Sequence, residues 1–109
     1  DVSFISLTQI IPGVVEVLGG CDWIALIKPQ FEVGKGGVKE GIVTNPELRA
    51  SAMESVLECA VTVGLQTRGL MASPITGESG NQEYLCWLSP THGRNPPQWS
   101  EQIHELAHS

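Results

Sequence analysis

The spacing of apolar residues predicts one long amphipathic helix in the middle of the chain, over residues 46–63. Apolar side chains recur there at steps of three and four and form a single stripe. The stripe consists of Leu48, Ala52, Val56, Ala60 and Val63. Asn45 can cap the first turn, Pro46 suits the first helical position, and Gly64 can adopt the left-handed conformation that ends a helix.

Three shorter runs predict β-strands. Residues 22–28 (DWIALIK) are apolar on both faces in their middle, which is typical of a central strand covered on both sides. Residues 65–72 and 82–88 are β-prone, and the loop between them is rich in Pro, Gly, Ser and Asn. We therefore expect these last two strands to pair antiparallel.

Two weaker helical patterns lie near the ends of the chain. Residues 6–18 have helical spacing, with a kink expected at Pro12 because proline removes a backbone donor. Residues 90–97 resemble a linker, so we divide the chain into residues 1–90 and a tail of residues 91–109. Apolar positions in the tail predict a short helix that packs back on the body, and they are Trp99, Ile103 and Leu106.

The order of these elements is helix, strand, long loop, helix, strand, strand, which predicts an α/β fold. A parallel sheet of only three strands would be poorly covered. We therefore interpret the chain as the back half of a larger doubly wound domain, with a mostly parallel sheet and an antiparallel last strand.

Composition narrows the class of protein. With 109 residues, 41% of them hydrophobic and 17% charged, the chain has room for one domain and one core. The longest apolar run, residues 23–27, is far shorter than the ~20 residues of a membrane span, and no leader peptide or anchor is expected. A net charge of −6 is opposite in sign to that of most free-standing nucleic-acid binders.

The cysteines and histidines do not have the spacing of a metal site. Cys21, Cys59 and Cys86 are widely separated, so we expect small buried apolar residues in a reducing cytosol rather than a disulfide framework. His104 and His108 could share a helix face, but no further ligand accompanies them at suitable spacing. We expect no metal.

Three polar residues are candidates for catalysis. Lys28 follows an apolar strand at the sheet edge where α/β proteins bind ligands, and loss of hydration there would let its amine act as a base near neutrality. The antiparallel last strand runs the other way, so its beginning, with Glu83, comes to the same edge. Asp1 is the third candidate. The alternatives are an ordinary strand-end lysine for Lys28, an exposed carboxylate for Glu83 and a helix cap for Asp1. The expected convergence of all three residues at one edge favours a functional site.

A glycine-rich loop carries Lys35 and Lys39. Its pattern, GKGGVKEG over residues 34–41, matches neither common nucleotide-binding signature, so a phosphate cradle is not expected. Half of the six basic residues fall between Lys28 and Lys39, and such a patch could face a phosphate backbone. The alternative is a solvated surface loop.

Three segments together resemble a known family. In order and spacing, DVSFISL, KPQFEVGKGG and SPITGESGNQEYLCWL resemble the C-terminal half of TlyA-type proteins. These proteins, also called hemolysin A, are cytidine 2′-O-methyltransferases of ribosomal RNA related to the FtsJ-type methyltransferases. The resemblance covers residues 1–90 and implies the C-terminal half of a Rossmann-like fold with S-adenosylmethionine as cofactor.

The resemblance also implies roles for particular residues. Three members of a Lys-Asp-Lys-Glu catalytic tetrad match Asp1, Lys28 and Glu83, while its first lysine has no counterpart here. Lys28 would take the proton of the ribose 2′-hydroxyl, and the two acidic residues would orient the lysines. Asp1 would also contact the cofactor, together with Ser3 and Phe4.

RNA and the ribosomal subunits are the implied partners, in the cytoplasm. Residues expected to contact RNA are Phe31, Lys35, Lys39 and Asn81, with Phe31 stacking on a flipped base or, alternatively, serving as a core aromatic. A second hypothesis is a non-catalytic piece that folds or dimerises through an exposed sheet edge. Membrane lysis, suggested by the older name, has little support because no segment is long or amphipathic enough to insert.

Overall fold

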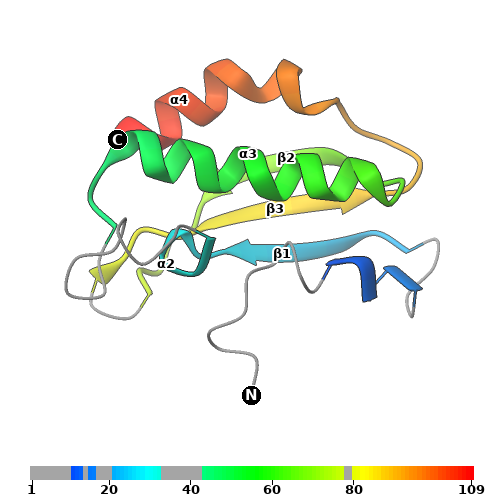
Figure 1. Ribbon diagram of the computed structural model, residues 1–109, viewed down its shortest axis with the longest axis horizontal. Coiled ribbons are helices and arrows are strands. Elements are labelled where there is room, and N and C mark those ends of the chain that lie inside the picture. Colours follow the sequence, from blue (N-terminus) through cyan, green and yellow to red (C-terminus); the bar gives the residue numbers. More distant parts are fainter. Residues whose placement is uncertain (1–10, 14, 17–20, 33–42, 78–79) are drawn as a thin grey trace.

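A three-stranded sheet lies at the centre of the molecule (Figure 1). The computed structural model describes residues 11–13, 15–16, 21–32, 43–77 and 80–109 of the chain. The strands are β1 (Trp23–Ile27), β2 (Gln66–Ala72) and β3 (Tyr84–Ser89). All three predicted strands are confirmed, with bounds that differ by two residues at most.

The direction of the strands differs in part from the prediction. β3 lies between β1 and β2 and pairs antiparallel with both, so the predicted antiparallel last strand is confirmed. Among the described residues, no neighbouring pair is parallel, and the mostly parallel sheet that we expected is not what these residues form. β1 and β2 do run in the same direction, but the return of the chain after β2 inserts β3 between them.

The long helix is α3 (Pro46–Thr62), and it agrees closely with the predicted one. Asn45 is its N-cap, with the side-chain oxygen accepting a hydrogen bond from the backbone N–H of Glu47 at 2.8 Å. Gly64 follows the helix with a φ of 85°, a left-handed conformation in which glycine is favoured. The buried stripe is wider than predicted, because Met53 and Leu57 are also fully buried.

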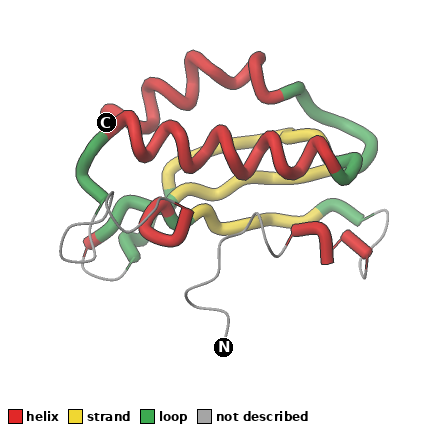
Figure 2. Tube along the Cα trace, viewed as in Figure 1, coloured by secondary structure: helices red, strands yellow, loops and turns green. Residues whose placement is uncertain are grey.

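α3 covers one face of the sheet (Figure 2). Alternate residues of the strands are buried on that face, as the period of two in a strand requires. Together with α3 they form the hydrophobic core, which includes Ala25, Ile27, Leu70, Cys86 and Leu88. The apolar middle of β1 was predicted to be covered on both sides, but only this face of it is buried.

Large apolar side chains are exposed in all three strands at the intervening positions. Ile24 is 59% exposed, Met71 53% and Trp87 39%. Trp87 donates its indole N–H to Asp22 at 3.0 Å, and the guanidinium of Arg68 lies 4.1 Å from the centroid of the Trp87 ring. This polar contact links residues before β1, in β2 and in β3.

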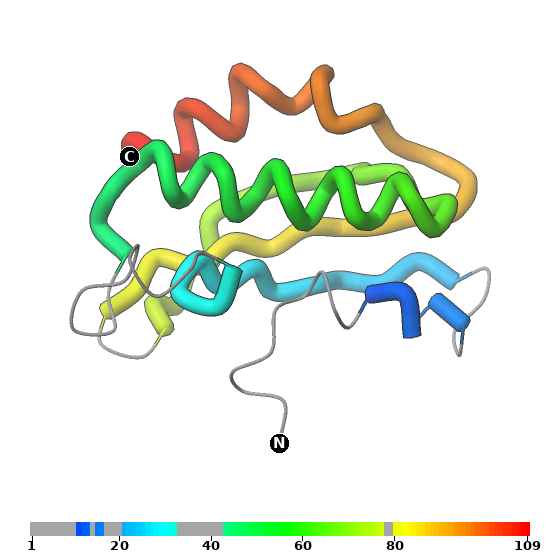
Figure 3. The backbone as a smooth tube through the Cα atoms, viewed as in Figure 1, coloured from blue at the N-terminus to red at the C-terminus, as the bar shows by residue number. Residues whose placement is uncertain are grey.

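The C-terminal tail forms the short helix η3 (Pro96–Trp99) followed by α4 (Ser100–His108), which runs beside α3 (Figure 3). Trp99 and Ile103 are buried in the same core as the α3 residues, and Leu106 is half-buried, as the sequence predicted. The predicted linker is tied down at Arg94, whose backbone N–H and C=O both pair with Thr67 of β2.

The structure describes only part of the helix that was predicted over residues 6–18. Residues 11–13 and 15–16 are helical and belong to the predicted helix over residues 6–18, the rest of which lies outside the described residues. No helix in the described ranges has both the length and the apolar character needed to cross a membrane.

Candidate active site

Lys28 and Glu83 lie at the same end of the sheet. Ile27, the last residue of β1, pairs with Tyr84, the first residue of β3. Lys28 directly follows that pair on one strand and Glu83 directly precedes it on the other. The antiparallel register therefore brings the backbones of Lys28 and Glu83 to the same end of the sheet, which is the arrangement that a shared site requires.

Glu83 is a buried carboxylate. Only 4% of it is exposed, and its Oε2 accepts a hydrogen bond of 2.9 Å from the side-chain N–H of Gln30. Its backbone oxygen accepts from the N–H of Ser73 at 2.8 Å, which fixes the start of β3 against the end of β2. Gly77 also packs against the carboxyl group, and a Cβ added there would overlap Glu83 Oε2. A larger residue at position 77 would displace this carboxylate.

Lys28 lies just before α2 (Pro29–Glu32), a single helical turn at the end of β1. It is half-buried, and its Nζ lies 5.2 Å from the centroid of the Phe31 ring, within the range of a cation–π contact. The backbone N–H of Phe31 donates to Lys28 O at 2.8 Å, so α2 holds the aromatic ring close to the amine. Phe31 is itself half-buried, so it is neither a fully buried core residue nor fully open to solvent.

Asn81 has a different environment from the one expected of an RNA contact. It is 1% exposed, and its Oδ1 accepts a hydrogen bond of 2.9 Å from the backbone N–H of Val43. Its backbone oxygen accepts from the N–H of Gly77 at 2.8 Å. The side chain thus joins the loop before β3 to the segment before α3. In this conformation Asn81 serves the structure, and the predicted RNA contact is not accessible to it.

Several predicted site residues cannot be placed. Asp1, Ser3, Phe4, Lys35 and Lys39 lie outside the described residues. The predicted cofactor contacts and the basic loop therefore remain predictions.

Two polar residues at this edge were missed by the sequence analysis. Gln30 holds the Glu83 carboxylate, and its Oε1 is buried without a hydrogen-bond partner. Tyr84 is fully buried, its hydroxyl also has no partner, and burial raises the pKa of that hydroxyl above its ordinary value. Both residues stand inside the segments KPQFE and GNQEY, so the only available signal was their place beside the predicted catalytic residues.

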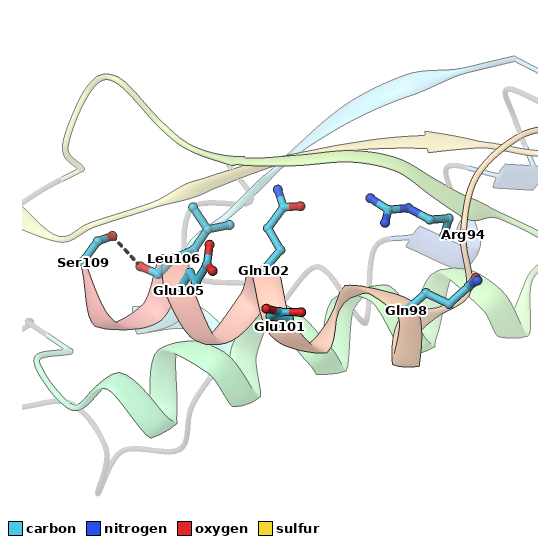
Figure 4. A pocket seen from close by; sticks show the side chains of 7 residues that line it. All are labelled: Arg94, Gln98, Glu101, Gln102, Glu105, Leu106 and Ser109. Carbon is cyan, nitrogen blue, oxygen red and sulfur yellow. Dashed lines mark hydrogen bonds between the residues drawn. The ribbon is translucent and has the colours of Figure 1, made fainter.

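A separate groove of about 570 Å³ runs along α4 (Figure 4). Its lining is mostly polar, with Arg94, Glu101, Gln102 and Glu105 among the lining residues, and Gln102 donates to the backbone oxygen of Leu70 in β2 at 2.6 Å. Of the predicted site residues that the structure describes, none lines this groove. No group of three His, Cys, Asp or Glu side chains within the described ranges could hold a metal ion.

Comparison with known proteins identifies the class. Residues 1–89 match the family described as FtsJ-like methyltransferase, and the chain belongs to that family. The resemblance to TlyA-type proteins is confirmed by curated relatives. The "16S/23S rRNA (cytidine-2′-O)-methyltransferase TlyA" of Mycobacterium tuberculosis is 46% identical over 94 residues, which are 81% of this chain and 34% of that protein.

Two further relatives agree with this assignment. "Hemolysin A" of Brachyspira hyodysenteriae is 40% identical over 88 residues, 79% of this chain and 37% of that protein. A solved structure from Streptococcus thermophilus, described as a "putative hemolysin", superposes with a TM-score of 0.86 at 37% identity and covers 99% of this chain and 39% of its own. The chain spans about a third of the length of the curated relatives it matches.

Proposed function

We propose that this chain is part of an S-adenosylmethionine-dependent methyltransferase that acts on the ribose 2′-hydroxyl of a cytidine in ribosomal RNA. The observation that carries the proposal is the register that brings Lys28 and Glu83 to one end of the sheet in a member of the FtsJ-like family. The substrate class comes from the relatives, among them the Mycobacterium tuberculosis protein that is named as an rRNA (cytidine-2′-O)-methyltransferase. The site of action is then the cytoplasm, where ribosomal subunits are assembled.

In this proposal Lys28 handles the proton of the reaction. The 2′-oxygen forms a bond to the methyl group and loses its proton to the amine of Lys28. When bound, S-adenosylmethionine would supply that methyl group from its sulfonium sulfur, which would keep the electron pair of the broken S–C bond and leave as a neutral thioether, and Asp1, Ser3 and Phe4 are the residues that we propose to hold it. The described residues suit the proton-handling half of the reaction, since a half-buried amine directly follows β1 and a buried carboxylate directly precedes the neighbouring strand β3.

Glu83 and the residues near Lys28 would orient the reactants. A buried carboxylate at this edge favours a nearby ammonium group and would hold the lysine amine in place after it takes up the proton. Phe31, which already lies against Lys28 Nζ, would present its ring to a base of the substrate. Lys35 and Lys39 would contact phosphate groups.

Substitution of Lys28 tests this assignment in the full-length protein that contains the chain. Lys28→Ala should abolish methyl transfer to ribosomal RNA while the circular-dichroism spectrum and melting temperature stay those of wild type. Lys28→Arg is the matched variant, because it keeps the positive charge but cannot give up its proton near neutrality, and it should also be inactive. Glu58→Gln, on the exposed face of α3, is the surface control. Turnover close to wild type in Lys28→Ala would remove Lys28 from the proposed role.

The alternative is a non-catalytic folded piece or a dimerisation module. Ile24, Met71 and Trp87 are exposed on the face of the sheet opposite α3, and apolar side chains at such a surface favour association with another protein surface. Calorimetric titration with S-adenosylmethionine separates the two hypotheses. We expect no binding to residues 1–109 alone and binding to the full-length protein. Absence of binding to the full-length protein would rule out the enzyme.

A further inference from the structure

We propose that Gln30 is a positioning residue that holds the Glu83 carboxylate in its working orientation. The proposal rests on the proposed function, and it adds a residue to which no role in the reaction has been assigned. Gln30 is the second residue of α2, and the two side chains come from positions 53 residues apart. The bond between them exists only because β1 and β3 are neighbours.

The carboxylate of Glu83 depends on this amide. An ionised carboxylate that is only 4% exposed must find hydrogen-bond donors inside the protein. Among the described residues, Glu83 makes no ion pair. The hydrogen-bond donor to its side chain is the Nε2 of Gln30, which lies 2.9 Å from Glu83 Oε2. A hydrogen bond to an ionised acceptor is shorter and stronger than one between neutral groups, so it can fix the rotamer of Glu83.

Packing against Gly77 also restricts the orientation of the Glu83 carboxylate. Gly77 leaves just enough room for the carboxylate, because a Cβ at that position would overlap Oε2. The carboxyl group is thus held between an amide donor on α2 and a glycine in the loop before β3.

The second end of the Gln30 amide is available for a donor. Its Oε1 is buried and has no hydrogen-bond partner, and buried unsatisfied acceptors are uncommon in folded proteins. An amide with one end on the carboxylate and the other end unoccupied can accept a hydrogen bond from a hydroxyl or ammonium group that enters the site. This would couple arrival of that donor to the orientation of Glu83.

The first experiment examines the bond itself in the 109-residue chain and requires no activity. In a 15N-edited NMR spectrum, one side-chain N–H of Gln30 should be shifted downfield by the charged acceptor, and Glu83→Gln should abolish that shift. Gln102 provides the matched control, because its amide donates to a neutral backbone carbonyl and should not respond to Glu83→Gln. A Gln30 signal that does not respond either would overturn the proposal, whatever the activity of the enzyme.

The second experiment measures methyl transfer in the full-length protein. Gln30→Met removes the donor at nearly constant length and should lower kcat about 10- to 100-fold, the usual effect of removing a group that supports a catalytic residue. KM for the RNA should change little, since Gln30 is not proposed to bind it. Gln30→Glu keeps the shape but replaces the donor by a second carboxylate, and it should also lower kcat if Gln30→Met does not fold. Gln102→Met should leave kcat unchanged.

The two experiments separate the possible failures. A responsive Gln30 signal with wild-type kcat in both folded Gln30 variants would overturn the positioning role. A responsive signal in a full-length wild-type protein that transfers no methyl group would instead overturn the proposed function, and with it the reaction that Gln30 was inferred to serve.

Discussion

Cys86 and Cys21 have the same side chain but opposite environments. Cys86 lies on the core face of β3 and is fully buried, which raises the pKa of its thiol to about 12. Cys21 precedes β1 and is exposed. All three cysteines were predicted from the sequence to be small buried apolar residues, and this is confirmed for Cys86 and wrong for Cys21. A residue type alone does not distinguish these cases, because burial depends on the elements that cover the position.

The two thiols should therefore differ in reactivity. The thiolate is the nucleophile, so a thiol with a pKa of about 12 contains almost none of the reactive form at pH 8. Iodoacetamide at pH 8 should modify Cys21 within minutes and leave Cys86 unmodified until denaturant is added, as measured by peptide mass spectrometry. Labelling of Cys86 in the folded protein as fast as Cys21 would contradict its burial.

The polar residues of the candidate site show the same dependence on neighbours. The sequence placed Lys28 at the end of one strand and Glu83 at the start of a strand that returns in the opposite direction, so both were expected at one end of the sheet. It did not predict that Glu83 is buried, that Asn81 is bonded to Val43, or that Gln30 reaches the carboxylate. These contacts join residues 38 to 53 positions apart, and no periodicity encodes them.

At the scale of elements, α3 was the most predictable part of the chain. Its N-cap, proline at the first position and terminal glycine act within a few residues, so the signal does not depend on the rest of the fold. The strands were predictable for the same reason. The conformation of the predicted linker was less predictable, because the pairing of Arg94 with Thr67 depends on the edge of a distant strand.

The N-cap of α3 can be tested separately. Asn45→Ala removes the acceptor for the Glu47 N–H and should lower the free energy of unfolding by about 1 kcal/mol, as measured by urea denaturation. Asn45→Asp keeps an acceptor and should retain most of the stability. Ser51→Ala, at an exposed interior position of α3, controls for the effect of a new alanine in the helix and should not destabilise it. Equal stability of Asn45→Ala and wild type would show that the cap contributes nothing.

At the scale of the whole molecule, the C-terminal tail shares the core with the preceding residues. Trp99 is 2% exposed, its indole N–H donates to the backbone oxygen of Arg94 at 3.3 Å, and the Arg94 guanidinium lies 3.8 Å from its ring centroid. η3 and α4 thereby pack against one side of α3. The family match ends at residue 89, before this tail, yet the tail shares the hydrophobic core with α3.

Removal of the Trp99 side chain should be costly. Trp99→Ala leaves a large cavity beside α3 and should lower the free energy of unfolding by about 3–5 kcal/mol in a denaturant titration. Trp87→Ala is the matched control, because that ring is 39% exposed and its loss should have a clearly smaller effect. A comparable loss of stability in the two variants would contradict the proposed role of the tail in the core.

The edges of the sheet restrict how two copies could associate. The outer edge of β2 is engaged by Arg94 through the backbone and by Gln102 through its amide. In the described part of the chain, β1 has one partner strand, β3, on one side. A dimer formed through a sheet edge would therefore use β1.

This prediction is tested by sedimentation velocity. The dimerisation alternative requires that the wild-type chain show association that increases with concentration, and that Ile24→Lys, which places a charge on exposed β1, reduce it. Glu54→Lys, which places the same charge on the exposed face of α3, should associate like wild type. A monomeric wild-type chain at all concentrations would exclude the dimer.

The sequence alone was enough to predict α3, the short helix of the tail, the three strands, the antiparallel return of β3 and the end of the sheet shared by Lys28 and Glu83. Each of these follows from spacing, caps and turns that act over a few residues. Only the tertiary structure decided which residues are buried, which face of β1 is covered, and which neighbours hold Glu83 and Asn81. Those properties arise from contacts between elements, and such contacts form only when distant parts of the chain pack together.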